Sequence, residues 1–308
     1  MGGFGTPNLT LALNLATFAY TQKQNKSDFK DFTPITRNAV SQPYEPVFNL
    51  LRTPDGTKYF IAVKGTSDNG KPFDENPELF SSSSKEEIET DMGRFNLGIY
   101  KSAMFVMLRI YSHISQQPLP IFISGHSYGA SVASVLHVLL KKEFPNIDVQ
   151  TVGFAPIPVM SVKGNSDEEL YTIITEEDLI PRLSVQSVYN TLKSTYPLFQ
   201  LLTPKTIDSA ILDVVEKYNV TGFAEAENLL IPWLRVQIPQ LIHQAISTEI
   251  KIKHPSGRAY LLHEGDKGPL ENCRVKDIDA LMYIPSSINA LQYHTIGAIG
   301  RSVKGIDS

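Results

Sequence analysis

The chain has 308 residues, a formal net charge of −4 and a single cysteine, Cys273. This length suffices for a full hydrophobic core, and the slight negative charge gives no reason to expect a nucleic-acid partner. One cysteine excludes an internal disulfide framework and any zinc site built from several cysteines, and it fits a reducing compartment. We therefore expect one globular domain over residues 1–308 that holds no metal.

The N-terminal residues bear on targeting. Met1–Thr6 match the pattern for N-myristoylation at Gly2, but the pattern is short, and we favour a flexible glycine-rich terminus. Leu9–Tyr20 is apolar but lacks a basic region before it and a clear cleavage site, so it predicts a first core helix instead of a signal peptide. Because no apolar run approaches roughly 18 residues, we expect no transmembrane helix and a cytoplasmic location, with membrane association left open.

Residues 46–66 predict a hairpin that ends in a buried strand. Val47–Leu51 and Tyr59–Val63 are apolar, and the turn sequence Pro54-Asp55-Gly56 separates them. The second strand leads directly into the short segment Lys64-Gly65-Thr66-Ser67. That segment is therefore expected at the end of a central strand.

The next segments alternate between helix and strand. After a polar and acidic stretch at 68–92, which predicts a solvated loop, residues 97–115 show the periodicity of a helix with one apolar face. Val149–Ala155 and Tyr171–Ile174 are short apolar runs typical of buried strands. Short strands that alternate with helices indicate an α/β fold with a mostly parallel central sheet and helices on both faces.

The segment Ile121–Ala130 combines an apolar strand, a sharp turn and a helix start, with Gly-His-Ser-Tyr-Gly at the turn. This is the G-x-S-x-G pattern in the strand–turn–helix context that its chemistry requires. Side chains at 125 and 129 would collide where the strand and the helix approach each other, which explains both glycines. Ser127 is therefore the candidate nucleophile, and a tight turn with only a structural role is the alternative.

A serine hydroxyl becomes nucleophilic only when a base takes its proton, and a third group must hold that base. Proteins that use this turn order the three groups along the chain as Ser, then Asp or Glu, then His. Asp178 lies where a predicted strand ends in an acidic loop, so it is the candidate acid. Its neighbours Glu176 and Glu177 are competitors for the same role.

Four histidines follow the acid in the chain: His243, His254, His263 and His294. Chain order favours His294, which opens the last segment, and leaves His263 as the main alternative. His243 falls on a helix of the predicted insertion at 190–250, and we interpret it as a core or surface residue. A further histidine, His126, stands beside the nucleophile, and we interpret it as a packing residue of the turn.

An oxyanion needs two preorganised hydrogen-bond donors. One should be the backbone N–H of Tyr128, the residue after the nucleophile. The other should come from a loop after an earlier central strand, and Gly65-Thr66-Ser67 is the well-placed candidate. We therefore predict an oxyanion hole formed by Thr66 and Tyr128.

Residues 190–250 interrupt the alternation of strands and helices. They contain a helical pattern at Ile207–Tyr218 and an apolar stretch at Leu229–Ile242, which includes Trp233 and two prolines. We interpret the region as a helical cap inserted into the domain. Its apolar surface either packs on the core or faces lipid and substrate. Regular structure resumes with a predicted hairpin at Ile250–Leu262.

Seven short motifs, in the same chain order, resemble those of class 3 lipases, a family of α/β hydrolases, and more narrowly those of its diacylglycerol-lipase-related branch. The motifs are Lys64-Gly65-Thr66, Leu97-Gly98-Ile99-Tyr100, Gly125–Gly129, Phe154-Ala155-Pro156, Asp178–Leu183, His254–Arg258 and Leu291–His294. The resemblance covers about residues 58–300 and supports Asp178 as the acid and His294 as the base.

Three features depart from the family pattern. Lys64 replaces the usual arginine, and Asn96 stands where the family usually has histidine. The segment after Thr66, where fungal members keep a short apolar lid, is long, polar and acidic here. The insertion at 190–250 is therefore the better candidate for a gate over the site.

The resemblance implies a serine carboxylester hydrolase that cleaves fatty-acyl esters of acylglycerols without a cofactor. Ser127 would attack the ester, His294 would carry the proton, and Asp178 would orient His294. Phospholipase A1-type activity on phospholipids and short-chain esterase activity are alternatives with the same catalytic residues. A non-catalytic lipid-binding protein on the same fold is a further alternative. The cap would supply any peripheral contact with a membrane or lipid surface.

Overall fold

The computed structural model of the protein describes residues 4–21, 28–67, 86–164, 168–176, 178–184, 256–276 and 294–307, together with the single residues 77, 81, 187, 190 and 252. Nearly all of the predicted cap therefore lies outside the described residues. The same is true of Gly2, Glu177, His243 and His254.

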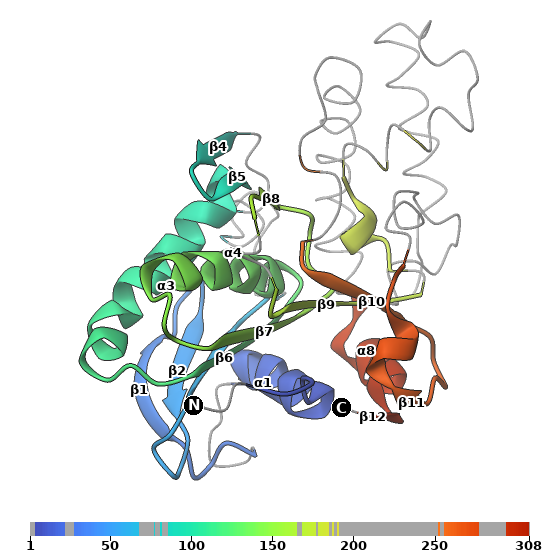
Figure 1. Ribbon diagram of the computed structural model, residues 1–308, viewed down its shortest axis with the longest axis horizontal. Coiled ribbons are helices and arrows are strands. Elements are labelled where there is room, and N and C mark those ends of the chain that lie inside the picture. Colours follow the sequence, from blue (N-terminus) through green and yellow to red (C-terminus); the bar gives the residue numbers. More distant parts are fainter. Residues whose placement is uncertain are drawn as a thin grey trace, which may run out of the picture.

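A seven-stranded sheet forms the centre of the molecule, in the order β1-β2-β3-β6-β7-β9-β10 (Figure 1). Its strands are β1 (Thr33–Asn38), β2 (Phe48–Arg52), β3 (Tyr59–Val63), β6 (Ile121–His126), β7 (Val149–Phe154), β9 (Leu170–Thr175) and β10 (Arg258–Leu262). From β3 to β10 all neighbours run parallel, whereas β1, β2 and β3 pair antiparallel. The predicted hairpin, which is β2 and β3, and the mostly parallel sheet are confirmed.

Helices cover both faces of this sheet. On one face lie α3 (Leu97–Gln116) and α4 (Tyr128–Glu143), and on the other lie α1 (Leu9–Thr21) and α8 (Ile296–Val303) (Figure 1). This arrangement confirms the predicted α/β-hydrolase architecture, and the first helix and α3 are each one residue longer than expected. None of the described helices is both long and apolar enough to cross a membrane.

The side chains of β3 explain why its sequence is apolar without interruption. Tyr59, Ile61 and Val63 belong to the core cluster that includes α3 and α4. Phe60 and Ala62 belong to the cluster that includes α1. Successive side chains of a strand point to opposite faces, and both faces of this sheet are covered. A central strand here therefore has no solvent-facing positions to fill with polar residues.

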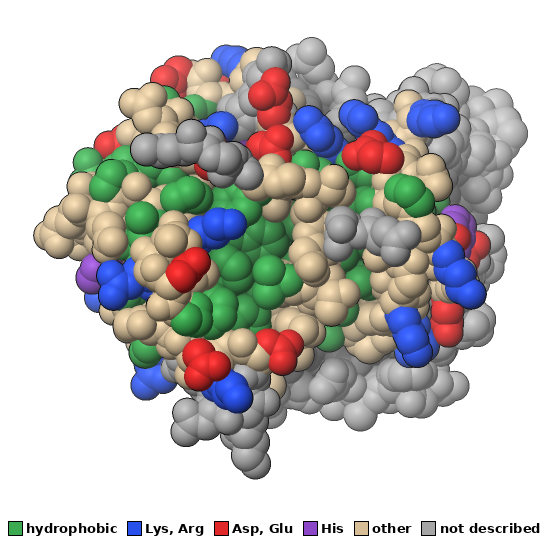
Figure 2. Space-filling view, turned by 60° about the horizontal axis from the view of Figure 1, so that its bottom comes forward, with side chains coloured by type: hydrophobic (Ala, Val, Ile, Leu, Met, Phe, Trp, Pro, Cys, Tyr) green, Lys and Arg blue, Asp and Glu red, His purple; other side chains and the backbone are tan. Residues whose placement is uncertain are grey.

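The core on the α1 side stays partly open to solvent. Partly buried side chains that pack against it include Phe4, Leu11, Leu13 and Phe32. Figure 2, which turns the bottom of Figure 1 toward the viewer, shows hydrophobic side chains gathered on this face between single charged ones. The Lys58 Nζ lies 4.9 Å from the centre of the Phe4 ring. Partly exposed apolar groups are common on folded proteins, so this face alone indicates no function.

A second, three-stranded sheet corrects one expectation. It consists of β4 (Glu87–Thr90), β5 (Gly93–Asn96) and β8 (Met160–Val162). The predicted solvated loop at 68–92 therefore ends in a strand. Glu87 and Glu89 both pair with Arg94, at 3.3 and 2.5 Å, while Ile88 between them packs against the core. The acidic composition concealed the period-two alternation that a half-buried strand requires.

Short elements complete the described fold. They are the 3₁₀ helices η3 (Ile180–Arg182) and η6 (Leu270–Cys273) and the parallel strand pair β11 (Gly268–Pro269) and β12 (Ile306–Asp307). The hairpin predicted at 250–262 is not seen in the described part of that segment. Its second half is β10, which pairs in parallel with β9, and Ile252 belongs to no strand.

Candidate active site

The turn between β6 and α4 holds Ser127 in a strained backbone conformation. Its φ of 56° and ψ of −125° lie outside the favoured regions for residues that carry a Cβ atom. Two backbone hydrogen bonds keep it there. Its N–H donates to the carbonyl of Phe154 at 2.9 Å, and its carbonyl accepts the N–H of Ser131 at 3.0 Å. The turn thus has the geometry that the sequence motif requires.

Two glycines allow the strand and the helix to pack closely at this turn. A Cβ atom at Gly125 would lie 2.6 Å from the carbonyl carbon and oxygen of Gly129. A Cβ atom at Gly129 would overlap the carbonyl oxygen of Val63 and lie 2.7 Å from the carbonyl carbon of Lys64. These neighbours are backbone atoms, which cannot rotate away as a side chain can. Both positions therefore require glycine for steric reasons.

We expect Gly129→Ala to destabilise the protein by several kcal/mol or to prevent folding, because the new methyl group would overlap the backbone after β3. The thermal unfolding midpoint measures the effect. Gly300→Ala is the matched control, because the nearest atom to a Cβ there is the Leu13 Cδ2 at 3.6 Å, an ordinary contact. That change should be neutral or stabilising by up to about 1 kcal/mol, since alanine favours the helix. Equal midpoints for the two variants would contradict the close approach.

The side chains of Ser127, His294 and Asp178 meet where the parallel strands end. The His294 Nε2 lies 2.8 Å from the Ser127 Oγ, and its Nδ1 lies 3.1 Å from both carboxylate oxygens of Asp178. The His294 and Asp178 side chains are 5% and 0% exposed. The structure therefore brings together three residues that were predicted separately from the sequence, although the serine and the histidine are 167 positions apart in the chain.

Turn hydrogen bonds determine where the acid and the histidine stand. Asp178 lies between β9 and η3, and its Oδ1 accepts the N–H of Ile180 at 3.0 Å. His294 directly precedes Thr295, whose Oγ1 caps α8 by accepting the N–H of Ala298 at 3.2 Å. An N-cap of this kind fixes the entry of the chain into the helix. Both side chains are thus presented by short, hydrogen-bonded connections.

A second pair of an acid and a histidine lies at the surface. The His263 Nδ1 is 3.0 Å from the Glu176 Oε2, and the two side chains are 46% and 50% exposed. The structure therefore pairs Glu176, an alternative for the acid, with His263, an alternative for the base. It brings Asp178 and His294, and not this pair, to the nucleophile.

The predicted oxyanion donors lie beside the turn. Tyr128 is the first residue of α4, so its backbone N–H stands at the positive end of that helix. A Cβ atom at Gly129 would lie 2.8 Å from the backbone nitrogen of Gly65, so the loop after β3 packs directly on the turn. Thr66 is the next residue of that loop and is partly buried. This proximity supports both residues as donors.

Asn96, which stands where the family usually has histidine, caps a helix. Its Oδ1 accepts the N–H of Ile99 at 3.0 Å at the start of α3. Asparagine is among the preferred N-cap residues because its short side chain reaches an otherwise unpaired N–H. This departure from the family pattern therefore has a local structural role.

His126, the last residue of β6, is part of the site in a way that the sequence did not indicate. The prediction of a packing residue is incomplete: the side chain is buried, but both ring nitrogens are hydrogen-bonded. Its Nδ1 lies 2.9 Å from the Tyr20 Oη, and its Nε2 lies 2.7 Å from the carbonyl oxygen of His294. These partners are 106 and 168 positions away, so no local pattern could have revealed them.

Burial disfavours the protonated form of His126. It lowers the pKa of this imidazole from 6.5 to about 3, and the nearby His294 adds to the effect. Because the native pKa lies below that of the unfolded chain, the contribution to stability is complete above pH 6.5 and is lost as the pH falls toward 3. We expect acidification to lower the free energy of unfolding by up to about 1.4 kcal/mol per pH unit through this group.

Urea denaturation at several pH values between about 7 and 4 measures this slope. In His126→Gln the slope should be shallower, since the group that takes up a proton on unfolding is gone. The remaining titratable groups contribute equally to both proteins, so they cancel in the difference between the two slopes. Identical slopes would show that folding does not lower the pKa of His126.

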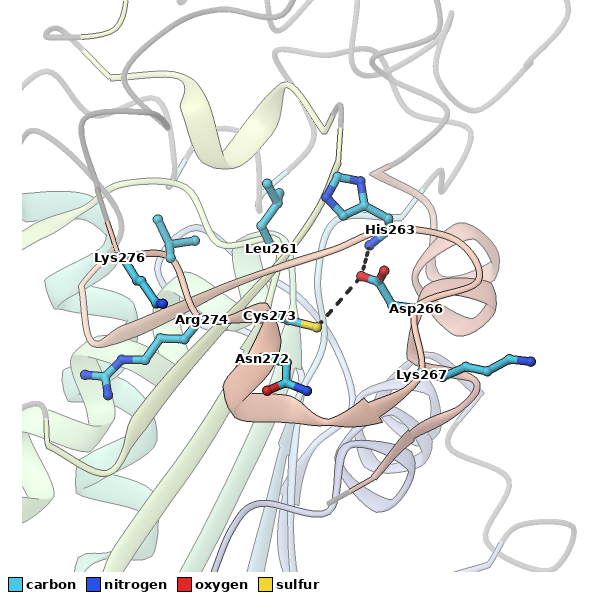
Figure 3. A pocket seen from close by; sticks show the side chains of 9 residues that line it. Leu261, His263, Asp266, Lys267, Asn272, Cys273, Arg274 and Lys276 are labelled. Carbon is cyan, nitrogen blue, oxygen red and sulfur yellow. Dashed lines mark hydrogen bonds between the residues drawn. The ribbon is translucent and has the colours of Figure 1, made fainter.

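A separate pocket of about 420 Å³ contains the single cysteine (Figure 3). In it the Cys273 thiol lies 3.8 Å from an Asp266 carboxylate oxygen, which also accepts the N–H of His263 at 2.8 Å. Burial raises the pKa of the Cys273 thiol, and the charge of Asp266 raises it further. A thiol that keeps its proton is a poor nucleophile, so this pocket offers no rival to Ser127.

Comparisons with known proteins match part of the chain. The model of the family described as lipase (class 3) matches residues 60–188, a region that includes Ser127 and Asp178. None of the curated proteins compared with the chain matches it.

Solved structures with a similar arrangement include two fungal lipases. The native lipase–propeptide complex of Rhizomucor miehei is 13% identical, with a TM-score of 0.45, over 57% of this chain and 62% of that one. A triacylglycerol lipase from Penicillium expansum is 15% identical, with a TM-score of 0.42, over 56% of this chain and 70% of that one. The chain thus spans less than two thirds of the Rhizomucor chain. Residues 60–188 of this protein, which include the strained serine turn, are therefore similar to the class 3 lipase family.

Proposed function

We propose that the protein is a serine ester hydrolase with Ser127, His294 and Asp178 as its catalytic residues. One observation supports this above all, the position of a single imidazole. The His294 ring stands 2.8 Å from the serine hydroxyl oxygen and 3.1 Å from both oxygens of the carboxylate. A hydroxyl, an imidazole and a buried carboxylate in this order can activate the hydroxyl as a nucleophile.

The first half of the reaction forms an ester on the enzyme. The Ser127 Oγ attacks the carbonyl carbon of the substrate while its proton passes to the His294 Nε2. Tyr128 and Thr66 donate hydrogen bonds to the oxyanion that forms. When the tetrahedral intermediate collapses, the alcohol leaves with the proton from His294, and the acyl group remains on the serine.

The second half returns the enzyme to its starting state. Water attacks the acyl carbonyl while His294 takes one of its protons, and a second oxyanion forms at the same donors. Collapse of this intermediate releases the carboxylic acid and restores the proton to the Ser127 Oγ. Bonds and protons balance without a cofactor.

Asp178 sets the tautomer of His294. A carboxylate can only accept hydrogen bonds, so the Nδ1 carries the proton and the Nε2 presents its lone pair to the Ser127 hydroxyl. The Asp178 side chain is fully buried, so water does not compete for it, and the Ile180 N–H supplies a further donor. When His294 gains a proton, the adjacent negative charge stabilises the imidazolium.

We further propose fatty-acyl esters of acylglycerols as the substrate class. The support is the family match over residues 60–188 and the motifs that resemble the diacylglycerol-lipase-related branch. Phospholipase A1-type and short-chain esterase activities would use the same three residues and differ in their contacts to the acyl chain and the head group. The predicted cap at 190–250 lies almost wholly outside the described residues, so its contact with lipid stays a prediction.

A panel of esters tests this function. The purified protein is given a soluble short-chain ester, long-chain mono-, di- and triacylglycerols, and phospholipid vesicles, and the released acid is measured. We expect the highest kcat/KM on a long-chain acylglycerol. A higher kcat/KM on the short ester or on phospholipid would contradict acylglycerols as the substrate class. It would leave the proposed catalytic residues unchanged. No release from any ester, with no labelling by a fluorophosphonate, would contradict ester hydrolysis itself.

A further inference from the structure

Tyr20, near the end of α1, and His126, at the end of β6, form a hydrogen-bonded pair next to the proposed catalytic histidine. The Tyr20 Oη lies 2.9 Å from the His126 Nδ1, and the His126 Nε2 lies 2.7 Å from the carbonyl oxygen of His294. We call Tyr20 and His126 the Tyr–His pair. It links the first helix, the strand before the nucleophile and the segment that carries the base.

Hydrogen-bond chemistry determines which group donates in each of these two hydrogen bonds. The carbonyl of His294 can only accept, so the His126 Nε2 carries a proton and donates it. The Nδ1 of a neutral ring is then an acceptor, and the Tyr20 hydroxyl donates to it. Burial keeps the ring neutral, because it lowers the pKa of His126 to about 3. The ring therefore has a single orientation and a single tautomer that satisfy both partners.

We propose that the Tyr–His pair positions the backbone of His294, and through it the imidazole, for proton transfer with Ser127. This role rests on the proposed function, because it assigns the pair a part in the reaction. His294 is anchored at two points, the Nδ1 by Asp178 and the main-chain carbonyl by His126. Two anchors on opposite parts of one residue restrict its ring, and a misplacement of about 1 Å can cost about 100-fold in rate.

The same pair supports the loop that carries a proposed oxyanion donor. A Cβ atom at Gly65 would overlap both the Tyr20 Oη and the carbonyl oxygen of His126. The backbone of the loop after β3 therefore rests directly on both members of the pair, one residue before Thr66. One small unit thus touches the nucleophile strand, the segment of the base and the oxyanion loop.

A neutral His126 ring does not oppose the protonation of His294. The centres of the His126 and His294 rings are 4.9 Å apart. His294 must gain a positive charge when it accepts the serine proton, and a second positive charge at that distance would oppose the transfer. Tyr20 and His126 touch no reacting atom, so they are positioning residues and not catalytic ones.

Tyr20→Phe removes a single oxygen from the pair and is the main test. We expect kcat on the preferred ester to fall about 10-fold or more, with KM nearly unchanged, because the base is misplaced while substrate contacts remain. Tyr260→Phe is the matched control. Tyr260 is buried, and its Oη donates to Glu271 at 2.8 Å, away from the proposed catalytic residues. It should lose stability to a similar extent and keep the wild-type kcat.

A second measurement does not depend on activity. NMR of ¹⁵N-labelled histidine should show the wild-type His126 ring neutral, with its proton on Nε2, and that proton should exchange slowly with water. In Tyr20→Phe the same proton should exchange about 10-fold faster or more, because the ring has lost the partner that fixes its orientation. Tyr260→Phe should leave the exchange unchanged.

The outcomes separate the positioning role from the proposed function. A wild-type kcat in Tyr20→Phe, or an equal fall in both Tyr→Phe variants, would overturn the positioning role and leave the ester hydrolase intact. A wild-type His126 that titrates near its ordinary pKa, or carries its proton on Nδ1, would also overturn the positioning role. Wild-type protein that neither hydrolyses an ester nor reacts with a fluorophosphonate would overturn the proposed function and the role that rests on it.

Discussion

Ser127→Ala is expected to lower ester hydrolysis by roughly 10⁴-fold or more and to leave the fold intact. The change removes only the Oγ, which lies 2.8 Å from the His294 Nε2. The φ of 56° at this position strains alanine as much as serine, because both carry a Cβ atom. Little stability should be lost, so the fall in activity will report the missing nucleophile.

Turnover of a chromogenic ester and labelling by a fluorophosphonate measure this effect, and thermal unfolding checks the fold. Ser134→Ala is the matched control. Ser134 is also buried on α4, and its Oγ donates to the carbonyl of Ala130 at 2.8 Å. That variant should stay active and should still be labelled. If Ser127→Ala retained about a tenth of the wild-type rate, the nucleophile would have to be another residue.

Asp178→Asn should lower kcat by about 10⁴-fold, although it replaces one oxygen by an NH₂ group. The asparagine amide can donate to the His294 Nδ1, so the imidazole proton moves to the Nε2. The nitrogen that faces Ser127 then cannot accept the hydroxyl proton. The fold should survive, because the amide has nearly the same volume and its oxygen can still accept the Ile180 N–H.

Glu176→Gln makes the same chemical change in the surface pair and serves as the control. The Glu176 and His263 side chains are about half exposed, and exposed pairs of this kind contribute little. Steady-state kcat should therefore stay within about twofold of the wild type. A larger loss for Glu176→Gln than for Asp178→Asn would transfer the role of the acid to Glu176. Circular dichroism of both variants verifies that the comparison is made on folded protein.

The local sequence alone determined the scaffold that presents the nucleophile. An apolar run followed by Gly-His-Ser-Tyr-Gly requires β6, a tight turn and α4, because the constraints are steric and act between neighbouring residues. The β2–β3 hairpin was predictable for the same reason. The local signal was mixed in β4. The charge of its glutamates indicated a solvated loop, although exposed and partly buried side chains alternate along it.

The meeting of particular polar side chains was decided only by the tertiary structure. Glu176 and Asp178 are two positions apart, yet one is half exposed and the other is fully buried against His294. Tyr20 lies 106 positions before His126 in the chain. Its hydroxyl reaches His126 because α1 packs against the sheet. Such contacts depend on the placement of whole helices and strands, and that placement is driven by burial of their apolar faces. The polar residues that perform the chemistry carry no periodic signal of where those faces will bring them.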